Sequence, residues 1–198
     1  DDDEEVLEVK KFLQKIFPDK TLYKYFMDLA SDVFVGGNYQ KKVYFWLGSG
    51  DNGKSILQKL MELMLGKLAI KFDTSLITGK KPGQGSAHAE LARSGGGVRW
   101  ATLDEPNKDE QINSGTMKKL SGNDSYFARD LFERGKDTRE IQPLFKLNFV
   151  CNKLPHIKYS DKAVWNRIRV LLFESVFMNA NDPDLPQSFE EQLREKKF

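Results

Sequence analysis

The stretch VYFWLGSGDNGKSILQKLMELML, residues 43–65, decides the fold of this chain. Its first five residues are apolar, which predicts a strand buried on both faces, and apolar residues recur at helical spacing in its second half. Between them, Gly48, Gly53, Lys54 and Ser55 form the pattern G-x-x-x-x-G-K-S. A strand, a glycine-rich turn and a helix in this order can surround an anion with backbone amides and the positive end of the helix. The stretch is therefore predicted to bind phosphate.

The loop between strand and helix is the predicted binding site of a nucleoside triphosphate. It comprises Gly48, Ser49, Gly50, Asp51, Asn52, Gly53, Lys54 and Ser55. Lys54 is expected to reach the β- and γ-phosphates, and the Ser55 hydroxyl is expected to bind Mg²⁺. The alternative is a glycine turn that leads into an ordinary helix without a ligand.

Composition limits the classes of protein to which the chain can belong. At 198 residues it is long enough for one α/β domain with a real core, and it begins at Asp1 like part of a longer protein. Its formal net charge of +2 excludes a polybasic mode of nucleic-acid binding, so any such binding needs a local patch. A single cysteine, Cys151, excludes an intramolecular disulfide and multi-cysteine zinc sites. Without a long apolar run or a signal peptide, we expect a soluble, intracellular fragment.

Two helices are predicted within residues 1–40. Pro18 ends the first helix, and Asp19 is a candidate N-cap of the second. The expected inner faces are Val6, Val9, Leu13 and Ile16 in the first helix and Leu22, Phe26, Leu29 and Val33 in the second. We expect a small helical layer or collar before the nucleotide-binding strand.

A second chemical motif is VRWATLDEP, residues 98–106. An apolar strand that ends in Asp104 and Glu105 places two carboxylates at the carboxyl edge of a sheet, where ligands of α/β proteins bind. Asp104 can bind Mg²⁺, and Glu105 can act as general base toward water. A water-activating Glu favours hydrolysis over phosphoryl transfer to a small molecule. Alone, the pair could also be two acidic residues of an ordinary loop.

Shorter elements are predicted between and after these motifs. We expect a strand at residues 69–72, a flexible glycine- and lysine-containing loop at 79–87, a helical turn at 88–94 and a short helix at 112–120.

Residues 125–145 read as a hairpin with the arms SYFARDLF and TREIQPLF. The turn at residues 133–137 carries two cations, Arg134 and Lys136. They are candidate contacts for nucleic acid. The alternative is an exposed polar hairpin whose charges only increase solubility.

Two polar residues flank the last predicted strands. Asn152 ends the apolar strand KLNFVCNKLP, residues 146–155, and could bind the γ-phosphate or its attacking water; alternatively it is a turn residue. Arg167 precedes the strand at 168–173 and is either a structural partner of a carboxylate or an arginine finger.

The order of GSGDNGKS, HAELARSGGGVRWATLDEP, KKLSGNDSYFARDLF, KLNFVCNKLP and WNRIRVLLF resembles the superfamily 3 helicase domain of poxvirus-type and phage- or plasmid-type primase-helicases. The resemblance covers residues 43–173. It implies an α/β fold related to AAA+ proteins, with a central, mainly parallel sheet flanked by helices. It also implies a homo-oligomeric ring, usually a hexamer, around single-stranded DNA, with ATP and Mg²⁺ bound at subunit interfaces. ATP hydrolysis would drive unwinding at the site of viral or mobile-element DNA replication.

The family's functional residues transfer onto matching positions of this chain. Gly48, Gly53, Lys54 and Ser55 match Walker A, and Asp104 with Glu105 matches Walker B. Asn152 matches the polar sensor and Arg167 the arginine finger, while Arg134 and Lys136 stand where the family's DNA-contacting hairpin stands. The implied division is a partial collar at 1–40, an ATPase core with an inserted hairpin at 41–176, and a C-terminal tail at 177–198.

The chain departs from the family in containing no primase domain and in its short N-terminal helices, so the fragment alone could be monomeric. Two other functions stay open. One is a nucleic-acid packaging or loading ATPase; the other is a scaffold that binds ATP without turnover. A scaffold needs Lys54 but not Glu105 or Arg167, and the presence of all three therefore argues for an enzyme.

Overall fold

The computed structural model describes residues 3–79, 89–107, 109–158 and 161–198. The helices are α1 (Glu4–Ile16), α2 (Lys20–Asp32), α3 (Lys54–Leu65), α4 (Ser75–Thr78), α5 (Ala89–Arg93), α6 (Ser114–Ser121), α7 (Lys162–Trp165) and α8 (Phe189–Glu195), with 3-10 turns at Gly66–Leu68, Ser94–Gly96 and Gly135–Asp137. The strands are β1 (Val43–Leu47), β2 (Ala69–Phe72), β3 (Trp100–Asp104), β4 (Ile112–Asn113), β5 (Tyr126–Ala128), β6 (Arg139–Ile141), β7 (Lys146–Cys151), β8 (Ile157–Lys158) and β9 (Ile168–Leu172).

Five of these strands form a parallel sheet in the order β2-β3-β7-β1-β9, which confirms the predicted α/β fold. From β1 the chain runs to β2 at one edge, returns through β3 and β7, and then crosses to β9 on the other side of β1. The loop after β1 therefore stands where the direction of winding changes, which is the usual ligand position in an open α/β sheet.

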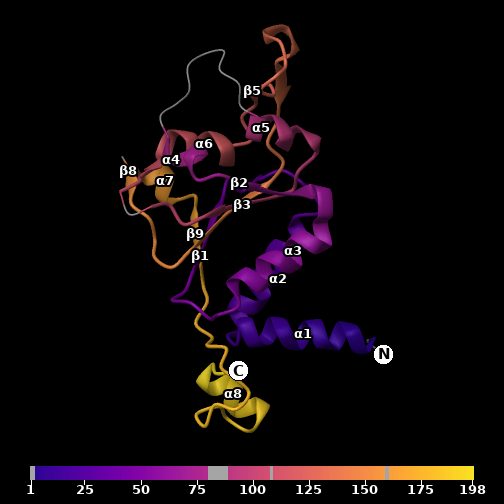
Figure 1. Ribbon diagram of the computed structural model, residues 1–198, viewed down its shortest axis with the longest axis vertical. Coiled ribbons are helices and arrows are strands. Elements are labelled where there is room, and N and C mark those ends of the chain that lie inside the picture. Colours follow the sequence, from indigo (N-terminus) through magenta and orange to yellow (C-terminus); the bar gives the residue numbers. More distant parts are fainter. Residues whose placement is uncertain (1–2, 80–88, 108, 159–160) are drawn as a thin grey trace.

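Alternate residues of β1 enter two separate cores. Val43 and Phe45 pack with α4 to α7 and the base of the hairpin, whereas Tyr44 and Trp46 pack with α1, α2 and α3. All four side chains are buried, so the prediction of a strand buried on both faces is confirmed. Figure 1 shows α2 and α3 on one side of the sheet and α4, α6 and α7 on the other.

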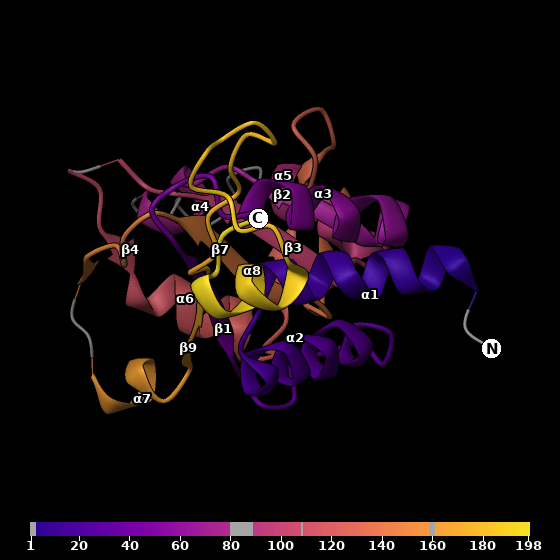
Figure 2. The ribbon, with the colours of Figure 1, turned by 90° about the horizontal axis from the view of Figure 1, so that it is seen from below.

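The two N-terminal helices form as predicted, and the Asp19 side chain caps α2 by accepting a hydrogen bond from the Leu22 N–H. One part of the expectation was wrong, because Val6 and Val9 are exposed and only Leu13 and Ile16 of α1 are buried. The amino-terminal half of α1 extends beyond the sheet (Figure 2). Its side chains therefore reach no core, and a shallow apolar groove remains between α1 and α3, lined by Glu8, Val9, Phe12, Ile56, Lys59, Leu60 and Leu63.

Local hydrogen bonds shift one further element from its predicted bounds. The helix expected at 112–120 begins at Ser114, since the Asn113 side chain accepts bonds from the Gly115 and Thr116 amides, and Ile112–Asn113 pair with β8 instead. The predicted strand at 69–72 is confirmed as β2. Of the loop predicted at 79–87, residues 80–87 lie outside the described part, as does residue 88 of the turn predicted at 88–94.

The predicted hairpin is present, but its antiparallel ladder is shorter than the predicted arms, with only Tyr126–Ala128 and Arg139–Ile141 paired. At the hairpin tip, carboxylate side chains accept hydrogen bonds from backbone amides, and these bonds take the place of the ladder. The hairpin projects from the end of the molecule opposite α8 (Figure 1). In the described ranges, no helix combines the length and apolar character needed to cross a bilayer.

A buried lysine links α2 to the start of β7. The Lys146 side chain is 2% exposed, and its ammonium contacts the Asp32 carboxylate at 2.5 Å and donates to the Gly37 carbonyl at 2.7 Å. A charge removed from water in this way depends on its partners, because an uncompensated ammonium is costly to bury.

We predict that Asp32→Asn lowers the free energy of unfolding by about 2 kcal/mol, less than for a fully buried pair because Asp32 remains partly in water. The matched control is Asp28→Asn on the same helix, where the ion pair with Lys24 is exposed on both sides. That change is expected to cost no more than about 0.5 kcal/mol. Urea unfolding of both variants measures the difference, and equal losses would contradict the role given to Lys146.

Candidate functional site

The loop between β1 and α3 ends at a helix start that no side chain of the described residues caps. Gly53 is the N-cap residue, with a left-handed φ of 83° that favours glycine, and the first intrahelical bond runs from the Leu57 amide to the Gly53 carbonyl. The amides at the start of α3 therefore have no intrahelical acceptor. Such a helix start favours an anion.

The first glycine of the loop is required by close packing. A Cβ on Gly48 would stand 2.0 Å from Asn52 Nδ2 and 2.7 Å from the Phe173 carbonyl oxygen. Asn52 is buried there and donates to the same carbonyl at 3.4 Å. Gly48 thus lets the loop close against the segment that follows β9.

Lys54 points back over the loop and contacts oxygens that surround its ammonium. Its Nζ donates to the Gly48 carbonyl at 2.5 Å, to Asn52 Oδ1 at 3.1 Å and to Asn152 Oδ1 at 3.5 Å. The side chain is 7% exposed, and burial lowers the pKa of its ammonium, with nearby Glu105 opposing the shift. The cation is held by neutral oxygens that an anionic ligand could replace.

Asn152 and Glu105 meet beside this lysine. Asn152 follows the last residue of β7, and its backbone N–H donates to Glu105 Oε2 at 2.8 Å. Glu105 follows the last residue of β3, and both side chains are exposed. The structure therefore brings together three of the predicted catalytic residues, Lys54, Glu105 and Asn152.

Asp104 also lies at this edge of the sheet, where it pairs with Lys71 of β2 at 2.7 Å. Both side chains are about half exposed, so the pair adds little stability. Sequence reasoning missed Lys71, and its position beside an acidic strand end became visible only once β2 was paired with β3.

The residues predicted to bind Mg²⁺ fit the chemistry of that ion. Ser55 and Asp104 offer a hydroxyl and a carboxylate, both accessible. Among the described residues there is no group of three or more His, Cys, Asp or Glu that could hold a metal by itself. Mg²⁺ suits such a site because it keeps several waters and binds through one or two protein groups together with substrate phosphates.

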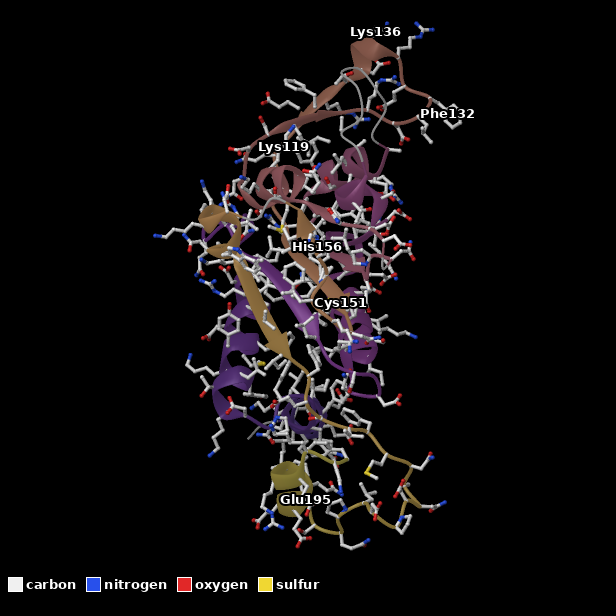
Figure 3. All side chains as sticks on the ribbon, turned by 90° about the vertical axis from the view of Figure 1, so that its left-hand side faces the viewer. Lys119, Phe132, Lys136, Cys151, His156 and Glu195 are labelled. Atoms are coloured by element: carbon white, nitrogen blue, oxygen red, sulfur yellow. The ribbon has the colours of Figure 1, made fainter. Side chains whose placement is uncertain are left out.

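The remaining predicted residues lie elsewhere. Arg167 precedes β9, and its carbonyl accepts from the amide of Val43, the first residue of β1, so it stands at the amino edge of the sheet. That is about 16 Å from the nucleotide loop for a strand of this length. Its guanidinium donates to the Ala163 carbonyl at 2.7 Å, and its buried Nε has no hydrogen-bond partner in the part of the chain that the structure describes. Arg134 and Lys136 lie at the hairpin tip, and Figure 3 shows Lys136 at the outer end of the hairpin.

The lone cysteine lies beneath the site rather than in it. Cys151 is buried at the end of β7, and burial together with the nearby Glu105 carboxylate raises the pKa of its thiol to about 12. A thiol that stays protonated is a poor nucleophile and metal ligand. Cys151 therefore contributes packing and not chemistry.

The C-terminal segment also supports the loop, which sequence reasoning did not anticipate. The Phe177 amide donates to the Asp51 carbonyl at 2.7 Å. A Cβ on Gly53 would meet the Ile16 side chain at 3.0 Å and the Phe177 ring at 3.1 Å. Residues from both ends of the chain thus pack against the loop, and no local pattern in the sequence indicates this.

Comparison with known proteins finds relatives in large DNA viruses, and no family model matches the chain. It is 53% identical over 173 residues to "Putative helicase 022R" of Frog virus 3 (isolate Goorha), covering 87% of this chain and 18% of that protein. It is 46% identical over 194 residues to "Putative helicase 184R" of Invertebrate iridescent virus 6, covering 98% and 20%. A match to "Putative primase C962R" of African swine fever virus (strain Badajoz 1971 Vero-adapted) is 28% identical over 191 residues, covering 92% and 19%. The chain thus spans about a fifth of the length of these relatives.

Among solved structures, the chain resembles the C-terminal region of NrS-1. One apo structure of that region (305–718) matches with a TM-score of 0.63 and 15% identity, over 95% of this chain and 42% of that one. The A form apo structure of the region matches with a TM-score of 0.61 and 16% identity over the same shares. At this identity the likeness establishes the fold alone.

We predict that Gly48→Ala lowers the free energy of unfolding by about 2 kcal/mol, because the added methyl would overlap Asn52 and the Phe173 backbone. Gly96→Ala is the control, since a Cβ there meets nothing within 4 Å. Urea unfolding of both variants provides the measurement. A Gly48→Ala variant as stable as Gly96→Ala would show that the loop is not packed this closely.

Proposed function

We propose that this chain is the ATPase part of a DNA helicase that works in viral DNA replication. The observation that carries the proposal is the convergence of Lys54, Asn152 and Glu105 beside an uncapped helix start. A triphosphate there would meet the amides of α3 and the Lys54 ammonium. The names of the viral relatives support the assignment as a helicase. The sequence resemblance narrows this proposal to superfamily 3.

In the proposed reaction, water attacks the γ-phosphate of ATP. Glu105 would accept the proton of that water, and Asn152 would orient the water or a γ-phosphate oxygen. Ser55 and Asp104 would hold Mg²⁺, which neutralises phosphate charge when bound. Lys71 would have to yield its contact with Asp104, an exchange that costs little because the pair is exposed.

Arg167 cannot serve the nucleotide of its own chain, since it lies at the opposite edge of the sheet. We propose that it acts on the nucleotide of a neighbouring subunit in a homo-oligomeric ring around single-stranded DNA. Its buried Nε has no partner among the described residues, which supports a role for the guanidinium beyond packing. A packaging or loading ATPase would use the same groups, and DNA unwinding assays separate it from a helicase.

We expect Glu105→Gln to bind ATP normally but to hydrolyse it at least about 100-fold more slowly, because the amide cannot accept the proton of water. Gln is the informative change, since its carbonyl oxygen can still accept the bond from the Asn152 N–H. Lys54→Ala is the companion variant and should lose binding as well. ATP binding by calorimetry and phosphate release measure the two steps. Parent-level turnover in Glu105→Gln would assign the base to another residue, and an inactive parent that binds ATP would favour a scaffold.

For Arg167→Ala we expect nearly unchanged ATP binding and a kcat lower by about 10³ to 10⁵, the range for an arginine finger supplied in trans. Mixing Arg167→Ala subunits with Lys54→Ala subunits should restore part of the activity, because some interfaces then combine an intact loop with an intact arginine. Phosphate release from mixtures of defined ratio tests this. If mixed rings form and no activity returns, Arg167 is structural.

A further inference from the structure

The hairpin tip carries apolar side chains that the fold leaves in water. Phe132 is 99% exposed, Leu131 is 64% exposed, and Phe127 on β5 is 66% exposed. Figure 3 shows Phe132 projecting from the hairpin near its far end, with Lys136 farther out. A phenylalanine with its whole ring in water adds nothing to folding through burial, so its place at the tip calls for another explanation.

The backbone of the tip presents this ring in a defined way. The Glu133 amide donates to the Asp130 carbonyl at 3.3 Å, so Leu131 and Phe132 occupy the two central positions of a tight turn. Two further bonds fix the turn, from the Asp130 amide to the Glu133 carboxylate and from the Leu131 amide to the Asp130 carboxylate, each 2.8 Å. The ring is therefore held outward by a hydrogen-bonded turn.

The carboxylates at the hairpin tip form ion pairs and hydrogen bonds with other groups of the hairpin. Glu133 pairs with Arg139, and hydrogen bonds from the Asp130 amide and from Arg139 lower the pKa of the Glu133 carboxyl. Asp137 accepts from the Arg134 amide at 3.0 Å. For Arg134 and Lys136, the described ranges hold no carboxylate within ion-pair distance of either side chain. Two cations thus stand close in sequence to one exposed aromatic ring.

The base of the hairpin is anchored in the core. Tyr126, Ala128 and Ile141 are buried, and the Tyr126 hydroxyl lies 2.5 Å from Ser94 Oγ. The outward-facing residue between the first two, Phe127, lies on the opposite side of the ladder. A hairpin with a buried base and an exposed aromatic and cationic tip is suited to contact a ligand outside the core.

We propose that Phe132 stacks on a base of single-stranded DNA while Arg134 and Lys136 contact the neighbouring phosphates. This combination suits a nucleic acid, because every base has a π-face and the backbone is anionic, and it suits a single strand because paired bases hide their faces. The proposal rests on the DNA contact of the proposed function and adds a residue that contacts bases rather than phosphates. Neither the loop at Lys54 nor Arg167 takes part in it.

The test separates stacking from charge. We expect Phe132→Ala to weaken binding of an oligothymidylate about tenfold, with an unchanged slope of affinity against salt, since no phosphate contact is lost. On an abasic strand of the same length, Phe132→Ala and the parent should bind equally. The double variant Arg134→Ala with Lys136→Ala should instead weaken the dependence of affinity on salt, both for the oligothymidylate and for the abasic strand.

Three further variants complete the design. Phe132→Tyr should bind as the parent does, Phe132→Leu should bind as Phe132→Ala does, and Phe127→Ala, with a similarly exposed ring on the arm, should change nothing. The proposal is overturned if Phe132→Ala loses the same affinity for the oligothymidylate and for the abasic strand, or if Phe132→Leu binds like the parent. It is also overturned if Phe132→Ala changes only the mass of the protein in solution, which would make the ring a subunit contact. A parent chain that binds no oligothymidylate would overturn it too. ATP turnover of the parent, measured separately, shows whether the nucleotide site stands independently of that failure.

Discussion

The register of β7 between β1 and β3 is the constraint on which the site depends. Cys151 pairs with Leu47 and Val150 pairs with Asp104, so three parallel strands end within one residue of each other. Asn152 therefore leaves the sheet between the loop that follows β1 and the carboxylates that follow β3. A shift of β7 by one residue would exchange its two faces and remove Phe149 from the core that it shares with Phe45, so core packing holds the register. The polar groups of the site are thus positioned by apolar residues buried in the two cores.

Much of this arrangement could be predicted from the sequence because buried parallel strands leave few alternatives. Apolar runs that end in Gly48, Asp104 and Asn152 must bring those residues to one edge if the strands are parallel neighbours. The N-cap at Asp19 was equally accessible, since it depends on one short-range hydrogen bond. In both cases the contact that forms the feature is either between residues close in sequence or required by the burial of the strands.

The features that sequence analysis missed depend on contacts between residues far apart in the chain, which no local sequence pattern indicates. The Lys71–Asp104 pair requires β2 to lie beside β3, and the support of Asp51 by Phe177 requires the chain to return to the loop after β9. The inner face predicted for α1 failed for a related reason. Helical periodicity shows which residues share a face, but not how far a neighbouring surface extends beneath them, and Val6 lies beyond it.

The strand that carries Asn152 also joins two distant parts of the molecule. Residues 142–145 lead from β6 directly into β7, so the base of the hairpin continues into the strand whose other end contacts Lys54. The first residue of β7, Lys146, is fixed by Asp32, while its last residue, Cys151, is buried beneath Glu105 and Lys54. Held at both ends and paired on both sides, β7 cannot bend without disturbing the sheet. One buried strand thus connects the base of the hairpin to the edge of the sheet where Asn152 contacts Lys54.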